Sequence, residues 1–388
     1  MSFNYNETQL SIIDSVQNIM KNFDDDYWFE CDKKSIFPHK FYDEIADGGW
    51  LGICMPKEFG GSALGITEAS IFMQKVSETG GGMAAASSIH INIFGPHPIV
   101  VHGNNNQKNK WLPSLINGKE KTCFGVTEPD AGLDTGKLKT FAKKINNGYL
   151  INGQKIWTST AQIADKILLL ARTTPIEECK KNTDGLTLFY TKLDRKKIEV
   201  KEIPKMGRSA VDSNQIFIDN LEVEEFDKIG EEGKGFKYIL DSLNPERILI
   251  AAEALGIGKN ALARAIKYAG DRVVFGKPIG QNQSIQHPLA ENWIELEAAE
   301  LLIAKAANQY DNGQNAGGMA NAAKFFAAEA GFKAATQAII TLGGMGYAKE
   351  YHVERLMRES LIPKLAPVSA QMILNYISER VLGLPKSY

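Results

Sequence analysis

The sequence has little cysteine, few arginines and no long hydrophobic run. Four cysteines in 388 residues, with no CxxC pair and no cysteine–histidine cluster at metal-ligand spacing, exclude a disulfide framework and a zinc site of that kind. No uninterrupted apolar stretch approaches the ~18 residues that a membrane span requires. Arginine supplies 9 of the 44 basic residues, and the first arginine in the chain is Arg172.

A large charge of one sign is also missing. The chain has 44 basic and 46 acidic residues and a formal net charge of −2, so no overall positive field favours nucleic acid or an anionic membrane. The amino-terminal segment MSFNYNETQL has neither the basic nor the apolar region of a signal peptide. Four unpaired cysteines suit a reducing compartment. We therefore expect a cytoplasmic protein that spans no membrane and binds no nucleic acid.

The chain changes character twice, which predicts three domains over residues 1–120, 121–230 and 231–388. Apolar residues recur at helical spacing in the first and last of these zones, for example at Ile12 and Val16 and at Ile248 and Leu255. The small residues of the last zone suit long, closely packed helices. The order of helices, strands and helices predicts an α+β fold rather than an alternating doubly wound sheet.

The middle zone contains turn signals and β-prone runs. Asn146-Asn147-Gly148 and Asn152-Gly153 are each typical of a tight hairpin turn. The β-prone runs cover residues 166–173, 186–190, 198–203 and 215–218. Because no long helical period separates these runs, we expect a domain of antiparallel strands.

Two features of the helical zones have a structural explanation beside a functional one. Gly256-Ile-Gly258 matches part of a dinucleotide-binding pattern, but the residues before it have helical rather than strand period. Glycines that allow two helices to pack closely explain this pattern better than dinucleotide binding does. Residues 83–102 are apolar and small, which fits a buried helix or, less readily, the wall of a cavity. The spacing of His90, His97 and His102 fits no simple metal site, so we expect them in the core or in a pocket.

Two loops in the middle zone could hold a polar heterocycle. Residues 124–134, FGVTEPDAGLD, join a β-prone start to a Pro/Gly turn whose free backbone N–H groups could bind a heterocycle edge or a phosphate. Residues 155–160, KIWTST, place Trp157 among hydroxyl groups. That tryptophan could stack on a planar cofactor, although taken alone such a residue is more often part of a core.

Taken together, these motifs resemble the acyl-CoA dehydrogenase family over nearly the whole chain. Four segments match in order: CFGVTEPDAG, KIWTSTAQIAD, DRVVFGKPIGQNQSIQ and TLGGMGYAKEYHVERLMRES. The resemblance implies an N-terminal helical domain, a middle antiparallel β domain and a C-terminal four-helix bundle, with FAD held between them. It also implies a homotetramer, an acyl-CoA substrate and electron transfer to an electron-transferring flavoprotein.

The resemblance implies roles for individual residues near FAD. The residues around the flavin ring and its reactive nitrogen would be Phe124, Val126, Thr127, Trp157 and Ser159. The residues on the ADP portion of a neighbouring subunit's FAD would be Arg272, Phe275, Gln283, Gly343 and Gly344. A late polar pair near the cofactor would be Ser369 and Gln371.

In this family a carboxylate removes the α-proton of an acyl-CoA thioester, and the β-hydrogen leaves as hydride to the flavin. Most members carry that base in a late turn, where this chain has Pro367. A minority, including isovaleryl-CoA and long-chain enzymes, carry it on an earlier helix, at a position matched here by Glu246. We therefore expect Glu246 to be the base. The alternative is that Glu246 only serves the dipole of a helix that begins at Pro245.

The substrate would lie against Gly132, Leu133, Asn244 and Arg247. In this region the chain departs from the family at two positions. Pro367 has no N–H to polarise the thioester carbonyl, and Leu133 replaces the usual serine. The apolar lining of residues 83–93 and the position of Glu246 favour a short or branched aliphatic acyl group.

Three functions remain open at this point. The first is an FAD-dependent acyl-CoA dehydrogenase. The second is a relative with other chemistry, such as an oxidase or a desulfinase, although a desulfinase would need a cation near the acyl end and residues 83–102 contain no arginine. The third is a non-catalytic protein that binds flavin or acyl-CoA.

Overall fold

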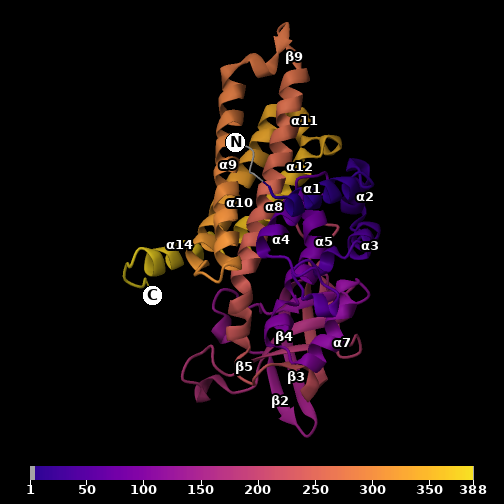
Figure 1. Ribbon diagram of the computed structural model, residues 1–388, viewed down its shortest axis with the longest axis vertical. Coiled ribbons are helices and arrows are strands. Elements are labelled where there is room, and N and C mark those ends of the chain that lie inside the picture. The colour runs from indigo at the N-terminus through magenta and orange to yellow at the C-terminus, as the bar shows by residue number, and fades with distance from the viewer. Residues whose placement is uncertain (1–4, 388) are drawn as a thin grey trace.

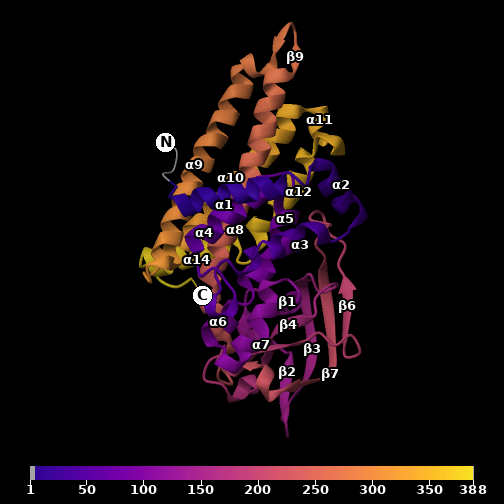
Figure 2. The same cartoon turned by 45° about the vertical axis from the view of Figure 1, so that its right-hand side comes forward.

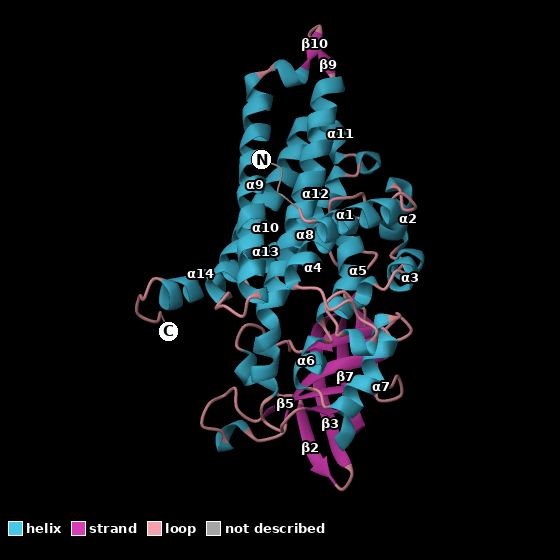
Figure 3. Cartoon of the chain, in the orientation of Figure 1, coloured by secondary structure: helices cyan, strands magenta, loops and turns pink. Residues whose placement is uncertain are grey.

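The computed structural model describes residues 5–387, so the first four residues of the MSFNYNETQL segment lie outside the description. The chain begins with helices, continues through a sheet and returns to helices, as Figure 3 shows. The N-terminal helices are α1 (Glu7–Met20), α2 (Asp25–Lys34), α3 (His39–Asp47), α4 (Ile66–Ser77), α5 (Gly82–Phe94), α6 (His97–His102) and α7 (Asn105–Ile116). The predicted α+β order is confirmed.

The middle part is an 8-stranded sheet. Seven of its strands follow the order β6-β7-β3-β2-β4-β5-β8, and the eighth, β1, pairs with β4. Its strands are β1 (Thr122–Gly125), β2 (Phe141–Ile145), β3 (Gly148–Ser159), β4 (Lys166–Arg172), β5 (Leu186–Lys192), β6 (Ile198–Glu202), β7 (Ser213–Glu224) and β8 (Lys228–Ile229). The pairing is antiparallel as predicted, except that β4 runs parallel to β1 and meets β2 in a single parallel pair.

The side chains of β4 alternate between two apolar clusters. On one face of the sheet, Ile167 and Leu169 belong to an apolar cluster with other strand residues such as Phe189. On the opposite face, Leu168 and Leu170 belong to a cluster that includes Trp111 of α7. A strand with both faces buried reads as a continuous apolar run, which is why this segment was predicted as a strand from composition alone.

One predicted turn is present and the other is not. Asn146 and Asn147 form the two-residue connection between β2 and β3, as predicted. Asn152-Gly153 instead lies inside β3, where the pairing register with β7 shifts between Ile151 and Gly153. A side chain at position 153 would collide with Thr140, so the glycine permits close approach of the chain rather than a reversal.

The C-terminal part is built on three long helices, α8 (Gly235–Asp271), α9 (Gln283–Asp311) and α10 (Gly317–Leu342). The shorter helices that follow are α11 (Gly344–Tyr347), α12 (Val353–Ser360), α13 (Ile362–Leu365) and α14 (Ala370–Tyr376). The helical domain is therefore confirmed, but its last helix is short and extends away from the other three (Figure 1). The hairpin of β9 (Val273–Val274) and β10 (Lys277–Pro278) joins α8 to α9.

The sheet and this hairpin lie at opposite ends of the molecule, and α8 runs between them (Figure 2). The predicted boundaries at residues 120 and 230 both fall in connections, since α7 ends at Ile116, β1 begins at Thr122, β8 ends at Ile229 and α8 begins at Gly235.

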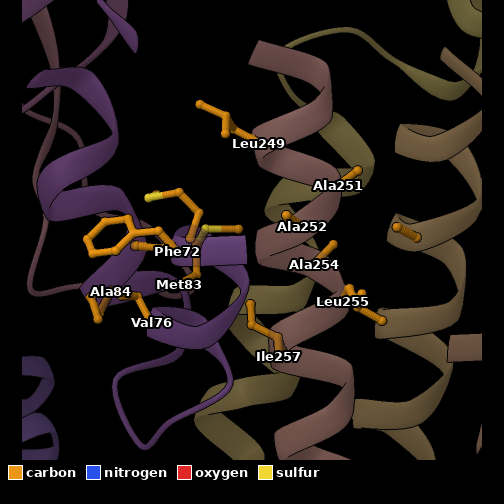
Figure 4. Packing of buried hydrophobic residues seen from close by; sticks show 14 of the residues in the cluster. Phe72, Val76, Met83, Ala84, Leu249, Ala251, Ala252, Ala254, Leu255 and Ile257 are labelled. Carbon is orange, nitrogen blue, oxygen red and sulfur yellow. The ribbon is translucent and has the colours of Figure 1, made fainter. Parts of the chain in front are cut away.

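Helix α8 is the centre of the largest apolar core. Figure 4 shows Phe72, Val76 and Met83 of α4 and α5 on the side that faces Ala252 and Ile257 of α8, and all five are fully buried. On its other side α8 packs against α10, where a Cβ on Gly258 would lie 2.9 Å from the Cα of Gly331. Gly258 therefore allows two helices to approach closely, which confirms the structural explanation of the Gly256-Ile-Gly258 pattern.

Within residues 5–387, no helix combines the length and the apolar character that crossing a bilayer requires. Each of the four cysteines is a free thiol.

Candidate active site

A cavity of about 430 Å³ lies where the three parts of the chain meet. Its walls come from α5, from β1 and the loop after it, from the end of β3, from the first half of α8 and from the turn after α13. It brings together nine of the residues predicted for the site: Phe124, Val126, Thr127, Gly132, Leu133, Trp157, Ser159, Glu246 and Arg247.

One wall of the cavity is flat and aromatic with a hydroxyl at its edge. Trp157 is 57% exposed although it lies within β3, because the pairing register of β3 with β7 shifts between Lys155 and Thr158 and the backbone of Trp157 has a φ of 61°. Phe124 and the hydroxyls of Thr127 and Ser159 line the same cavity. An exposed indole ring beside hydrogen-bonding groups fits a planar polar heterocycle such as the flavin of FAD.

A buried ion pair joins the two segments that form this wall. Lys155 Nζ lies 2.8 Å from Glu128 Oε1 and 3.1 Å from the Val126 carbonyl oxygen, and both charged side chains are buried. Burial alone would raise the pKa of the Glu128 carboxyl, but Lys155 and the backbone N–H groups of Lys139 and Thr140 hold it below its usual value. The pair thus fixes the 126–128 loop against β3.

Glu246 lies in the interior of a helix and not at its start. Helix α8 begins at Gly235 and continues through Pro245, so the alternative that Glu246 serves a helix dipole in a first turn is wrong. Glu246 lines the cavity and is half-buried. This burial raises the pKa of Glu246 to about 7, although the positive charges of His90, Arg247 and Lys324 oppose the rise.

The turn at Pro367 carries no carboxylate. Ala366, Pro367 and Val368 line the cavity, and the Ala366–Pro367 peptide bond is cis. The Val368 carbonyl oxygen accepts a hydrogen bond of 2.7 Å from Lys324 Nζ of α10. Pro367 therefore shapes the cavity without supplying a proton acceptor or an N–H donor.

Two groups that line the cavity were not among the predicted site residues. His90 of α5 was expected in a core or a pocket, and it faces the cavity with its Nδ1 2.6 Å from Glu253 Oε1. Arg208 donates from Nη2 to Ser159 Oγ at 3.0 Å and to Ser213 Oγ at 2.8 Å. A lone arginine in the loop KMGRSA of an arginine-poor chain is the signal that could have found Arg208. Residues 83–93 are thus less apolar towards the cavity than their composition suggested.

Eight predicted site residues lie outside this cavity: Asn244, Arg272, Phe275, Gln283, Gly343, Gly344, Ser369 and Gln371. Asn244 accepts a hydrogen bond from Arg247 at 3.1 Å, and Ser369 caps α14. Phe275 is fully exposed at the tip of the β9–β10 hairpin. Twenty-five residues of α8 separate Glu246 from the end of the helix, which at 1.5 Å per residue amounts to about 37 Å. The hairpin residues therefore cannot reach the cavity of their own chain.

Comparison with known proteins places this arrangement in a family. Residues 6–119, 123–221 and 233–382 match the N-terminal, middle and C-terminal domain models of acyl-CoA dehydrogenase. The sequence is 33% identical over 392 residues to acyl-CoA dehydrogenase FadE12 of Mycobacterium tuberculosis, covering 100% of this chain and 99% of that protein. It is 32% identical over 354 residues to the caffeyl-CoA reductase-Etf complex subunit CarC of Acetobacterium woodii, covering 91% and 92%.

The fold agrees with these matches. The structure of butyryl-CoA dehydrogenase from Megasphaera elsdenii superposes with a TM-score of 0.93 at 30% identity, covering 98% of this chain and 100% of that one. Three domain models, a full-length relative and a full-length structural match lead to one conclusion. The chain belongs to the acyl-CoA dehydrogenase family, whose members are oxidoreductases that act on acyl-CoA.

Proposed function

We propose that this chain is an FAD-dependent acyl-CoA dehydrogenase that desaturates an acyl-CoA thioester between its α and β carbons, with Glu246 as the base. The observation that carries the proposal is that Glu246, a half-buried carboxylate, lines the same cavity as Trp157 and Ser159. Bound FAD supplies the acceptor for the β-hydrogen, which leaves as hydride. Among residues 5–387 no side chain donates a hydrogen bond to Glu246, so its carboxylate is free to take the α-proton.

Burial makes Glu246 a stronger base than an exposed glutamate. With a pKa near 7, the conjugate acid holds the proton more tightly, and the driving force for proton removal from the α-carbon rises accordingly. The apolar side chains of Leu243 and Ile250 lie on the same side of α8 and line the cavity beside this carboxylate.

We propose that FAD extends between two copies of the chain. Phe124, Val126, Thr127, Trp157 and Ser159 would hold the flavin ring, with Ser369 and Gln371 nearby. The ADP portion would be bound by Arg272, Phe275, Gln283, Gly343 and Gly344 of a neighbouring subunit. The long distance from the hairpin to the cavity supports this division, and it fits a homotetramer. We further propose an electron-transferring flavoprotein as the electron acceptor and the cytoplasm as the location.

The test is anaerobic titration of the purified flavoprotein with saturated acyl-CoAs of graded length, followed by the visible absorbance of the flavin. Bleaching by one class of chain supports the proposal and names the substrate class. Binding without bleaching by any of them contradicts it and favours the non-catalytic alternative. Rapid reoxidation of the bleached flavin by oxygen alone would instead indicate an oxidase.

The pH dependence of the reaction should report the pKa of Glu246. Because only the carboxylate form accepts a proton, kcat/KM is expected to rise about tenfold per pH unit below pH ~7 and to level off above it. The groups that set this pKa are His90 of α5, Arg247 and Glu253 of α8 and Lys324 of α10. Steady-state rates across the range, with flavin content measured at each pH as a control, check this. A flat profile between about pH 6 and 8 would contradict it.

A further inference from the structure

The inner end of the cavity is polar. Glu246, Ile250 and Glu253 are four and three residues apart on α8, so they lie on one face of the helix, and Glu253 is two turns beyond the proposed base. His90 faces Glu253 from α5 and lines the cavity together with Glu246 and Ile250. An acyl chain that lies with its α-carbon at Glu246 and runs along α8 therefore points its far end towards His90.

The His90–Glu253 pair leaves one ring nitrogen without a partner. Nδ1 of His90 lies 2.6 Å from Glu253 Oε1, while Nε2 of His90 is buried and makes no hydrogen bond with any residue of the described chain. His90 is 6% exposed and Glu253 is fully buried. A buried polar atom without a partner is costly, and one in the wall of a cavity is commonly satisfied by what fills that cavity.

The carboxylate beside Nδ1 favours the protonated form of His90, in which Nε2 is a donor. Burial alone would lower the pKa of His90, but the carboxylate of Glu253 outweighs burial and raises it above the usual value. Nδ1–H then donates to Glu253 and Nε2–H is directed at a second acceptor. Arg208, which also lines the cavity, bonds two serine hydroxyls, and no carboxylate of the described residues lies within ion-pair distance of it. Both groups favour an oxygen that accepts hydrogen bonds.

We propose that His90, held by Glu253 and assisted by the charge of Arg208, binds an oxygen atom at the far end of the acyl chain. The substrate is then a short acyl-CoA with a terminal hydroxyl, carbonyl or carboxylate oxygen and not the plain aliphatic chain that the composition of residues 83–93 favoured. This inference rests on the proposed function for the placement of the α-carbon. An ordered water on Nε2 is the competing occupant.

The experiment compares three five-carbon probes that differ only at the far end: valeryl-CoA, 5-hydroxyvaleryl-CoA and glutaryl-CoA. The flavin-loaded protein carries Glu246→Gln, so that the probes bind without reacting, and calorimetry gives each Kd. A hydrogen bond from a charged donor is expected to make both oxygen-bearing probes about tenfold or more tighter than valeryl-CoA. A larger gain for glutaryl-CoA than for the hydroxyl probe would identify the oxygen as anionic.

In the same background, His90→Phe should reduce this preference to about twofold or less while valeryl-CoA still binds. His90→Gln, which keeps an N–H donor, should retain part of the preference and decides the matter if the phenylalanine variant fails to fold. His97→Phe is the matched control, because His97 is a histidine of α6 outside the cavity and should leave the preference unchanged.

Two results would overturn the inference: valeryl-CoA binding as tightly as the oxygen-bearing probes, which means that the subsite holds water only, or a preference that survives both His90 substitutions. Failure of the proposed function is a separate result. It would be seen as the absence of flavin bleaching in the unmodified protein, whichever probe binds best.

Discussion

A Glu246→Gln variant is expected to bind FAD and acyl-CoA and to lose flavin reduction by a factor of about 10²–10⁴ or more, because glutamine keeps the shape of the side chain but cannot accept the α-proton. The turn at residues 366–368 offers no other proton acceptor. Pro367 carries no carboxylate, and the Val368 carbonyl oxygen already accepts a hydrogen bond from Lys324. Anaerobic stopped-flow measurement of flavin bleaching at saturating acyl-CoA gives the rate directly.

Asp241→Asn is the matched control for this variant. Asp241 lies on the same helix, five residues before the proposed base, and its carboxylate pairs with His102 outside the cavity. Its loss should leave the bleaching rate within about twofold of the unmodified protein, as expected for a partly exposed ion pair. If Glu246→Gln bleaches at a rate comparable to this control, the base lies elsewhere.

The second large effect is expected at Lys155. Replacing it with methionine removes one partner of a buried ion pair and leaves Glu128 charged and enclosed, which should lower the free energy of unfolding by about 3–5 kcal/mol. The variant also frees the Val126 carbonyl and with it the loop that carries Thr127, so flavin should be lost more readily. Denaturant unfolding and the ratio of flavin to protein absorbance measure the two effects.

Lys139→Met is the control for Lys155→Met. Lys139 also pairs with an acidic residue of this loop, Asp130, but that pair is exposed, and such pairs contribute little. Equal destabilisation by the two substitutions would mean that the loop is held by its backbone bonds rather than by the buried charge.

Most of the fold could be predicted from local sequence patterns. The predictions that failed concern positions where contacts between distant segments decide the structure. Asn152-Gly153 has the composition of a turn, yet the chain continues as β3. Thr140, the residue before β2, lies so close to Gly153 that a side chain there would collide with it. Pro245 looks like the first residue of a helix, where its missing N–H costs nothing. Helix α8 nevertheless runs through it, because the packing of α8 against α4, α5 and α10 outweighs one lost hydrogen bond.

Some residues of the candidate site could be predicted from the sequence, whereas others depend on how distant segments come together. Loop residues such as Thr127 and Ser159 could be assigned from motifs, because the groups that matter are adjacent in sequence. His90 and Glu253 are 163 positions apart, and no periodicity indicates that α5 and α8 bring them within 2.6 Å. Arg208 becomes part of the site only through its bonds to Ser159 and Ser213, which depend on how the 206–212 loop folds over the sheet.

The placement of Glu246 and Glu253 on one rigid helix restricts how this protein can change over evolutionary time. Seven residues return a helix to nearly the same face, whereas each inserted or deleted residue rotates everything beyond it by about 100°. A single insertion between positions 246 and 253 would turn Glu253 away from His90 and disturb the packing of α8 on α4 and α10 as well. Lineages of this chain can therefore alter the inner end of the cavity by exchanging side chains but not by changing the length of α8.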